Sequence, residues 1–266
     1  MAGLMFGPVC GMLAVVSGLF ALAGGSDPAD AACRLRVGWE PYAIYTYADE
    51  TGKVSGADID LMRAIGRDLG CEIIFKQAPW TRVLLEVENG TIDVSTSTSR
   101  TPERDKYARF SNSYRTTEMA IYVRRGEVGI YGLDNLGAVA KTGFRLGVIA
   151  GYHYGPEFAS LMRDPAFAGF IDEAVDYQTN IRKLMHGRID GYLVEDVGVM
   201  LAEARTLGVL DQIERYPLAI PGEELHLMFS RKTVGPETVK AINASLERIM
   251  ADGRLSKFVD RHMNMK

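Results

Sequence analysis

The sequence is short of the residues that bind metals, build disulfide networks or attack substrates. It holds 3 cysteines, 2 tryptophans and 4 histidines among 266 residues. Neither a nucleophile elbow nor a Walker-type phosphate loop is present. The histidines show no metal-ligand spacing: they are His153, His186, His226 and His262. We therefore expect no metal, no cofactor and no catalytic residue. We expect His153 to lie in a solvent-exposed loop; the alternative is a place at the cleft, for which it is the only candidate among the four.

An excess of positive charge is also missing. The formal net charge is −4, which gives the protein no general attraction to nucleic acid or to an anionic membrane surface. Hydrophobic residues make up 47% of the chain and charged residues 24%, values typical of a globular protein. The sequence contains no internal repeat and no low-complexity tract. Its length allows one large domain or two smaller ones.

The N-terminal segment has no charged side chain before Asp27. Leu4 to Ala23 is almost wholly apolar, and the stretch from Ala29 to Ala31 has the small residues of a peptidase cleavage site. We expect residues 1–31 to be a secretory signal peptide that directs the protein to the periplasm. The alternative is an uncleaved membrane anchor, because about twenty apolar residues can span a bilayer.

Two cysteines follow the predicted signal peptide, and each stands directly before a predicted strand. Cys33 precedes residues 34–38, and Cys71 precedes residues 72–76. Consecutive parallel strands of a βαβ unit usually lie side by side, so the two sulfurs can meet at one end of the sheet. We expect a disulfide, which the periplasm permits. The alternative is a pair of free buried thiols.

The most informative motif runs from residue 90 to residue 104. Ile92–Thr96 has the character of a short buried strand, and hydroxyl residues crowd its C-terminal end. Thr101 and Pro102 then offer an N-cap and a first helical residue, and Arg104 follows inside this helix. A strand that ends at a capped helix favours anion binding, and a planar guanidinium suits a carboxylate. The alternative is a polar loop with a solvated arginine.

Strands and helices alternate along the rest of the chain, as they do in parallel α/β units. A second unit begins near Leu133, and the C-terminal helices have no strand of their own to cover. We therefore expect these helices to pack on the first unit, so that the chain crosses between two lobes twice. We place residues 32–122 and 226–266 in lobe 1 and residues 123–225 in lobe 2. Two lobes joined by paired extended segments hinge around a cleft.

Several short motifs occur in a recognisable order and spacing: Gly56–Leu61, Pro79-Trp80, Gly90–Asp93, Thr101–Arg104, Phe110-Ser111 and Gly187–Asp190. On these motifs the chain resembles, from about Cys33 onwards, the family 3 periplasmic solute-binding proteins of ABC transporters, which bind polar amino acids. The resemblance implies an α/β, two-lobed periplasmic-binding-protein fold of type II. In that fold each lobe is a parallel-type sheet flanked by helices, and two strands form the hinge.

The resemblance also assigns roles to side chains on both sides of the cleft. It implies that Arg104 clamps the carboxylate of the ligand, and that an acid after the Gly187–Asp190 motif receives the ammonium group. Counting along the chain leads to Glu195, with Asp196 one step away. The other implied ligand contacts are hydroxyl residues, aromatic residues and a loop of the second lobe: Ser99, Ser97, Thr96, Tyr42, Tyr45, Trp80, Gly151 and Tyr152. The residues themselves leave structural roles open, since the acids can cap a helix and Trp80 can belong to the core.

The function that the resemblance implies is a monomeric periplasmic receptor. It would close on an amino acid or related small carboxylate and deliver it to an ABC permease. An alternative on the same fold is a cyclohexadienyl dehydratase-like enzyme that acts on prephenate or arogenate, with Glu195 as general acid. A membrane-bound sensor domain is a third class, which we do not expect because no transmembrane helix follows the last predicted helices.

Overall fold

The computed structural model describes residues 3–4, 7 and 33–263. The predicted signal peptide, residues 1–31, otherwise lies outside the described residues, and so does the alternative reading of this segment as a membrane anchor. A compact unit begins at Cys33. Among the described residues, no helix combines the length and the apolar character needed to cross a bilayer.

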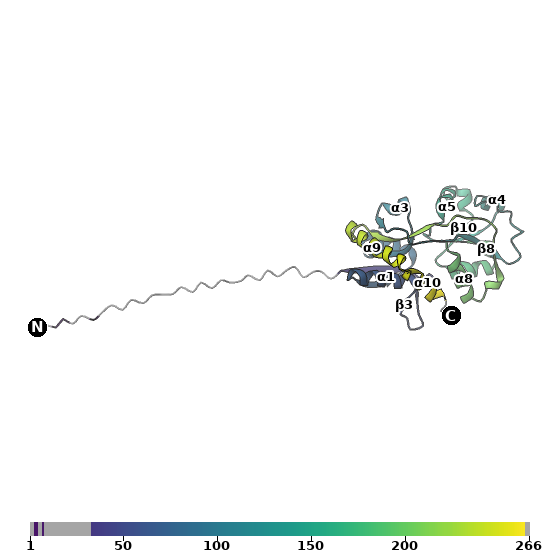
Figure 1. The fold of residues 1–266 in the computed structure, drawn as a ribbon. Helices are drawn as coiled ribbons and strands as arrows, with labels where there is room; N and C mark the ends of the chain where they lie inside the picture. The colour runs from purple at the N-terminus through teal and green to yellow at the C-terminus, as the bar shows by residue number, and fades with distance from the viewer. Residues whose placement is uncertain (1–2, 5–6, 8–32, 264–266) are drawn as a thin grey trace. The chain divides into compact units, whose positions relative to one another are not determined.

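The first lobe is built around a mixed sheet (Figure 1). Within residues 33–263 this sheet has six strands in the order β4-β1-β5-β13-β6, with β7 beside β13. The strands β1, β4 and β5 are parallel, and β13 is antiparallel to β5, β6 and β7. Their bounds are β1 Arg34–Trp39, β4 Glu72–Gln77, β5 Val94–Ser99, β6 Ala108–Phe110, β7 Arg115–Thr116 and β13 Glu224–Ser230. The parallel strands therefore end at one common edge, where Trp39 and Ser99 lie.

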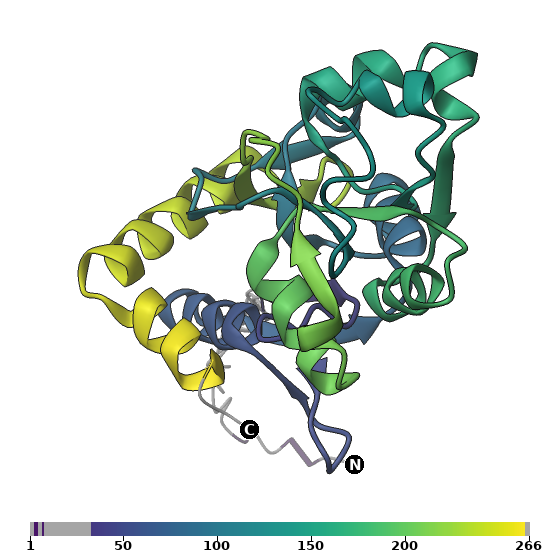
Figure 2. The same cartoon turned by 90° about the vertical axis from the view of Figure 1, so that its right-hand side faces the viewer.

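Helices pack on both faces of this sheet because alternate strand residues enter different apolar clusters. In β13, Phe229 belongs to the cluster beneath α1, α9 and α10, whereas Met228 belongs to the cluster beneath α2. The C-terminal helices α9 and α10 contact α1 (Figure 2), which confirms their predicted place on the first lobe. The helix bounds are α1 Ala57–Leu69, α2 Trp80–Asn89, α3 Pro102–Asp105, α9 Pro236–Ala251 and α10 Arg254–Met263. A short hairpin of β2 Tyr47–Ala48 and β3 Val54–Ser55 precedes α1.

The second lobe repeats this arrangement on a smaller scale. Among the described residues its sheet has five strands in the order β10-β9-β11-β8-β12, and β8 is antiparallel to both of its neighbours. Their bounds are β8 Ala120–Arg124, β9 Leu146–Ile149, β10 Ile171–Ala174, β11 Gly191–Val194 and β12 Ile213–Arg215. The two-lobed α/β fold is thus confirmed, with sheets that are mixed rather than purely parallel.

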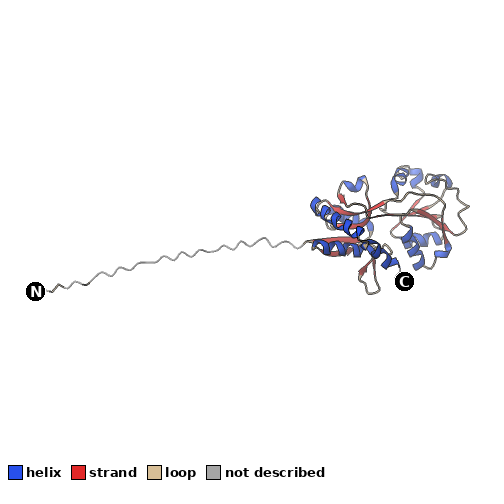
Figure 3. Cartoon of the chain, in the orientation of Figure 1, coloured by secondary structure: helices blue, strands red, loops and turns tan. Residues whose placement is uncertain are grey.

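The helices of the second lobe also flank their sheet (Figure 3). In β11, Tyr192 enters the cluster beneath α7 and α8, and Leu193 enters the cluster beneath α4, α5 and α6. The helix bounds are α4 Ala138–Thr142, α5 Gly155–Leu161, α6 Pro165–Ala168, α7 Tyr177–Met185 and α8 Val197–Thr206, followed by the 3₁₀ turn η1 Leu210–Gln212. Residue alternation in the strands therefore gives each lobe a core on either side of its sheet.

The two crossings between the lobes run side by side. The backbone N–H of Thr117 donates to the carbonyl oxygen of Glu223 at 2.9 Å, and Met119 forms an isolated β-bridge with Ile220. Gly222 is required at this close approach, because a Cβ at this position would collide with the carbonyl oxygen of Thr117. The crossing segments therefore have the geometry of a paired hinge.

The sheet pairings place these crossings slightly earlier than the predicted lobe boundaries. Residues 120–122 were assigned to the first lobe, but β8 begins at Ala120 in the second sheet. Residues 224–225 were assigned to the second lobe, but β13 begins at Glu224 in the first sheet. The reason is that each crossing is continuous with a strand, so no turn residue in the sequence marks where the chain leaves one sheet.

Cys33 and Cys71 form the predicted disulfide, with their Cα atoms 4.5 Å apart. The parallel register of β1 and β4 sets Arg34 opposite Glu72, and this brings the residue before each strand together. The bond lies at the N-terminal ends of these strands. It therefore closes the edge of the sheet opposite to the one where the candidate site lies.

Candidate ligand-binding site

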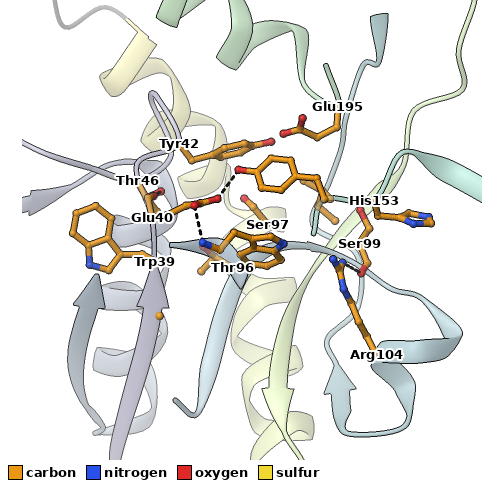
Figure 4. Close-up of a pocket in the computed structure, with 14 residues that line it drawn as sticks. Trp39, Glu40, Tyr42, Thr46, Thr96, Ser97, Ser99, Arg104, His153 and Glu195 are labelled. Atoms are coloured by element: carbon orange, nitrogen blue, oxygen red, sulfur yellow. Dashed lines mark hydrogen bonds between the residues drawn. The ribbon is translucent and has the colours of Figure 1, made fainter. Parts of the chain in front are cut away.

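A small pocket lies between the two lobes, at the carboxyl edge of β1 and β5 (Figure 4). Eight of the side chains expected to contact a ligand line it: Arg104, Ser99, Ser97, Thr96, Tyr42, Trp80, Tyr152 and Glu195. Further residues that were not expected to contact a ligand also line it: Gly38, Trp39, Glu40, Thr46, His153 and Leu225. The pocket thus combines residues of β1, β5 and α3 in the first lobe with loop residues of the second.

Arg104 reaches the pocket because β5 runs directly into the short helix α3. The side chain of Thr101 accepts a hydrogen bond from the backbone N–H of Arg104, which confirms the predicted N-cap, and Pro102 occupies the first turn. The strand itself differs from the prediction, since β5 spans Val94–Ser99 instead of ending at Thr96. Ser95, Thr98 and Ser99 pair with β13, so the hydroxyl run belongs to the sheet, although serine and threonine runs are usually read as strand ends.

The guanidinium of Arg104 is buried and joins the two lobes. It donates to the carbonyl oxygen of Ser99 at 2.7 Å and, across the cleft, to the carbonyl oxygen of Gly151 at 3.0 Å. Both of these acceptors are backbone oxygens, and the guanidinium forms no ion pair with an acidic side chain of the described residues. Burial lowers its pKa. Arg104 stays charged nonetheless, because an arginine in a protein keeps its proton. A buried cation without a carboxylate is an anion-binding group.

Trp80 and Gly151 close the wall beside Arg104. The indole N–H of Trp80 donates to the carbonyl oxygen of Gly151 at 2.9 Å, and its ring lies 5.5 Å from the guanidinium carbon of Arg104. Gly151 adopts a left-handed backbone with φ +77°, and a Cβ there would press against Trp80. The carbonyl of Gly151 therefore contacts both first-lobe side chains, although Gly151 is not among the residues that line the pocket.

Glu195 lies at the end of β11 and lines the pocket from the second lobe. The hydroxyl of Tyr177 donates to its Oε1 at 2.5 Å, and the hydroxyl of Tyr42 points toward the same carboxyl group (Figure 4). Oε2 is buried and has no hydrogen-bond partner among the described residues. Burial raises the pKa of Glu195 to about 8. In its ionised form this carboxyl group can accept a hydrogen bond at Oε2 from a cation that enters the pocket, and such a cation favours the ionised form.

Asp196 and Tyr45 do not line the pocket, which corrects two of the expected ligand contacts. Asp196 caps α8 by accepting from the backbone N–H groups of Gly198 and Val199, and it also pairs with Arg115 at 2.6 Å. The ring of Tyr45 lies under the same arginine, with 3.7 Å between the guanidinium carbon and the ring centroid. Both side chains are therefore engaged by Arg115, a residue that the sequence pattern had not singled out.

Ser97 lines the pocket, but its hydroxyl is already occupied. It donates to Asp58 Oδ2 at 2.5 Å and accepts from the guanidinium of Arg115 at 2.9 Å. Its φ of 51° is in the left-handed region that few residues other than glycine adopt. The side chain of Thr96 also hydrogen-bonds to Asp58, so Ser99 is the freer candidate for ligand contact.

Glu40 is the main pocket residue that the sequence motifs did not predict. Its Oε1 accepts from the hydroxyl of Tyr152 at 2.6 Å, and its Oε2 accepts from the backbone N–H of Trp80 at 2.9 Å. Burial raises the pKa of Glu40 to about 7. The signal was present, because Glu40 directly follows β1 in the same loop as Tyr42, and residues after parallel strands gather at the ligand edge.

His153 was expected in an exposed loop, and that expectation is wrong. Its side chain is only 18% exposed and lines the pocket. Burial and the charge of Arg104 lower the pKa of this imidazole, so the group is neutral near pH 7. No group of three or more His, Cys, Asp or Glu side chains within the described residues could hold a metal ion.

The arrangement complements a zwitterion. One end of the pocket presents the unpaired cation Arg104, and the other presents the carboxyl groups of Glu195 and Glu40. Aromatic rings separate these ends and remove water, which strengthens both electrostatic contacts. A two-lobed α/β protein with a charged pocket at its hinged cleft belongs to the class of solute receptors.

Residues 35–265 match the family model of bacterial extracellular solute-binding proteins, family 3. The match covers most of the chain, and the protein belongs to this family. The resemblance noted from the sequence motifs is thereby confirmed.

Individual relatives agree with this assignment. The chain is 26% identical over 239 residues to the L-cystine-binding protein of Escherichia coli, covering 85% of this chain and 81% of that protein. It superposes on the structure of an ancestral arginine-binding protein bound to arginine with a TM-score of 0.72 and 26% identity, covering 86% and 97% of the two chains. It also has the fold of an ancestral amino acid-binding protein described as a precursor of cyclohexadienyl dehydratase, with a TM-score of 0.69, 22% identity and coverage of 87% and 96%.

Proposed function

We propose that the protein is a periplasmic receptor that closes on an amino acid or related small carboxylate and delivers it to an ABC permease. The observation that carries this proposal is the buried guanidinium of Arg104, which has no acidic partner among the described residues. The ligand carboxylate takes that place. Oε2 of Glu195, which has no hydrogen-bond partner within residues 33–263, receives the ligand ammonium. Ser99, Thr96, Tyr42, Trp80 and Tyr152 complete the contacts.

Closure of the lobes accounts for tight binding in this proposal. Arg104 and Trp80 of the first lobe already donate to the carbonyl oxygen of Gly151 across the cleft, and Glu40 accepts from the hydroxyl of Tyr152. These contacts exclude water, so the charged contacts to the ligand form in a low dielectric. The protein acts as a monomer and leaves the ligand chemically unchanged. Residues 1–31 serve as its signal peptide.

The test is a calorimetric screen of amino acids and small carboxylates against the wild type, Arg104→Ala and Arg100→Ala. Arg100 is the matched control, because it pairs with Asp105 at 2.9 Å and its side chain is 59% exposed. We expect Arg104→Ala to lose about 2–5 kcal/mol of binding free energy, the usual cost of breaking a buried charge pair. Arg100→Ala should bind like the wild type. Equal affinity of all three proteins for the ligand would refute the carboxylate assignment.

A second candidate function has one observation in its favour. Glu195 is buried and its pKa of about 8 keeps it protonated at neutral pH, the state that a general acid needs. A dehydratase acting on prephenate or arogenate would use this proton to release the ring hydroxyl as water. The ring carboxylate would leave at the same time as CO2, and the electron pair of that C–C bond would complete the aromatic ring. Mixing the protein with prephenate tests this directly. If the wild type forms phenylpyruvate and Glu195→Gln does not, the enzyme function would replace the receptor function proposed above.

A further inference from the structure

The ligand pocket has a second chamber beside it. A larger groove lies between the lobes on the other side of Glu40 and Tyr152, and these two residues line both spaces. The hydrogen bond from the Tyr152 hydroxyl to Glu40 Oε1 is part of the wall between them. The pocket encloses about 50 Å³ and the groove about 620 Å³. The pocket alone has room for roughly four water molecules, so a ligand with a long side chain must extend into the groove.

The groove is acidic. Besides Glu40 it is lined by Asp176 at the start of α7 and by Glu203 on α8, with Gln77 and Gln178 as neutral polar neighbours. No Lys, Arg or His is among the described residues that line it. Glu203 is partly buried and accepts from the side-chain amide of Gln178 at 3.0 Å. The groove therefore offers negative charge without a cation of the protein to balance it.

The charges of the pocket also favour a ligand with an additional positive charge. An amino acid places its carboxylate on Arg104 and its ammonium on Glu195, whose buried Oε2 lacks a partner among the described residues. Glu40 then remains as a second carboxyl group, across the pocket from Arg104 (Figure 4). The backbone N–H and the phenol that it accepts from are both neutral donors. One further positive charge on the ligand would balance this carboxylate.

We propose, building on the receptor function above, that the ligand is an amino acid with a long, positively charged side chain. Its α-groups lie on Arg104 and Glu195. The side chain displaces the hydroxyl of Tyr152 from Glu40 and places its cation in the groove, within the field of Glu40, Asp176 and Glu203. Glu40 thereby determines specificity, since it is the acid shared by the two spaces.

The experiment compares L-arginine with L-citrulline, which has a side chain of the same length but no charge. By calorimetry at pH 7.5, the wild type should bind arginine at least about 30-fold more tightly than citrulline. In Glu40→Gln this ratio should fall to about threefold or less, because the amide keeps the shape and loses the charge. Glu203→Gln should lower the ratio by a smaller factor. Glu173→Gln is the matched control, an exposed acid of β10 outside the groove, and should leave the ratio unchanged.

The remaining outcomes separate this inference from the receptor function. If the wild type binds a neutral or acidic amino acid and ignores arginine, the receptor stands and the cationic ligand is refuted. Equal binding of arginine and citrulline refutes it as well. If no amino acid or carboxylate binds the folded protein, the receptor function fails and the inference falls with it. Circular dichroism of each variant shows whether a fall in the arginine-to-citrulline affinity ratio results from unfolding.

Discussion

Two arginines near the cleft, the buried Arg104 and the mostly buried Arg115, have different surroundings. Arg115, on β7, pairs with Asp196 of the second lobe at 2.6 Å, donates to Ser97 and lies on the ring of Tyr45. Arg104 donates only to two backbone carbonyl oxygens and pairs with no acid among the described residues. The two side chains thus resemble each other in burial and differ in whether a carboxylate is present.

Because of this difference, the pKa of Arg104 is lowered and the pKa of Arg115 is raised. Burial lowers the pKa of Arg104 by more than the charges of Tyr107 and Glu103 raise it. Burial also acts to lower the pKa of Arg115, but Tyr42, Tyr45 and the carboxylates of Asp196 and Asp58 raise it by more, so the net pKa is raised. A buried guanidinium with its acids in place holds the structure together, whereas one without them is available to an anion from solution.

The largest effect on stability is expected for Arg115→Ala. The change leaves the buried carboxyl groups of Asp196 and Asp58 facing no cation, which typically costs about 3–5 kcal/mol of the free energy of unfolding. Arg34→Ala is the control, since Arg34 forms an exposed pair with Glu72 and should cost about 1 kcal/mol or less. Urea denaturation of both variants measures this. A loss for Arg115→Ala no larger than for Arg34→Ala would show that the pair is dispensable.

An intermediate effect is expected from pH, through the acid end of the pocket. The folded pKa of Glu195 is about 8, above its ordinary value, so between about pH 5 and 8 the folded protein holds a proton that the unfolded chain has lost. Stability of the ligand-free protein should therefore fall as pH rises through this window, by up to about 1.4 kcal/mol per pH unit. Glu40, with a pKa of about 7, adds to the slope in the lower part of the window.

Glu195→Gln should flatten this pH dependence and make the ligand-free protein more stable than the wild type at pH 8. Thermal denaturation of both proteins from pH 5 to 8.5 measures it. Ligand binding near pH 7 should also release protons, because a bound ammonium favours the ionised carboxylate. An identical pH profile in wild type and variant would mean that Glu195 ionises as it does in water.

The smallest effect is expected for Arg104→Met in the ligand-free protein. The substitution gives up two hydrogen bonds to carbonyl oxygens but also removes a buried charge that no acid balances, so the terms oppose each other. Unfolding free energy should change by about 1 kcal/mol or less. A loss of unfolding free energy as large as that for Arg115→Ala would show that Arg104 has a structural role and that the two arginines do not differ in function.

The sequence predicted contacts between residues that are close together in the chain better than contacts between residues that are far apart in it. Thr101, Pro102 and Arg104 act within one helical turn, so the motif predicted both the cap and the position of the guanidinium. The disulfide also followed from local pattern, because each cysteine adjoins one of two neighbouring strands. Contacts within a turn or between consecutive strands leave a signal in the chain itself.

The errors concern side chains whose partners are far away in sequence. Asp196 and Tyr45 were expected to contact the ligand, but Arg115, whose position the sequence pattern did not reveal, engages both. The C-terminal end of β5 was predicted too early, because the strand that pairs with it there, β13, lies more than a hundred positions later in the sequence. Such pairings are properties of the assembled lobes.

The most direct test of the central claim is a double-mutant cycle on the carboxylate contact. The amino acid found in the screen and its α-carboxamide are each titrated calorimetrically into the wild type and into Arg104→Ala. If Arg104 holds the carboxylate, the wild type should bind the amide about 100-fold more weakly than the acid, and Arg104→Ala should bind the two alike. A wild type that does not distinguish them, or a variant that still does, would contradict the account.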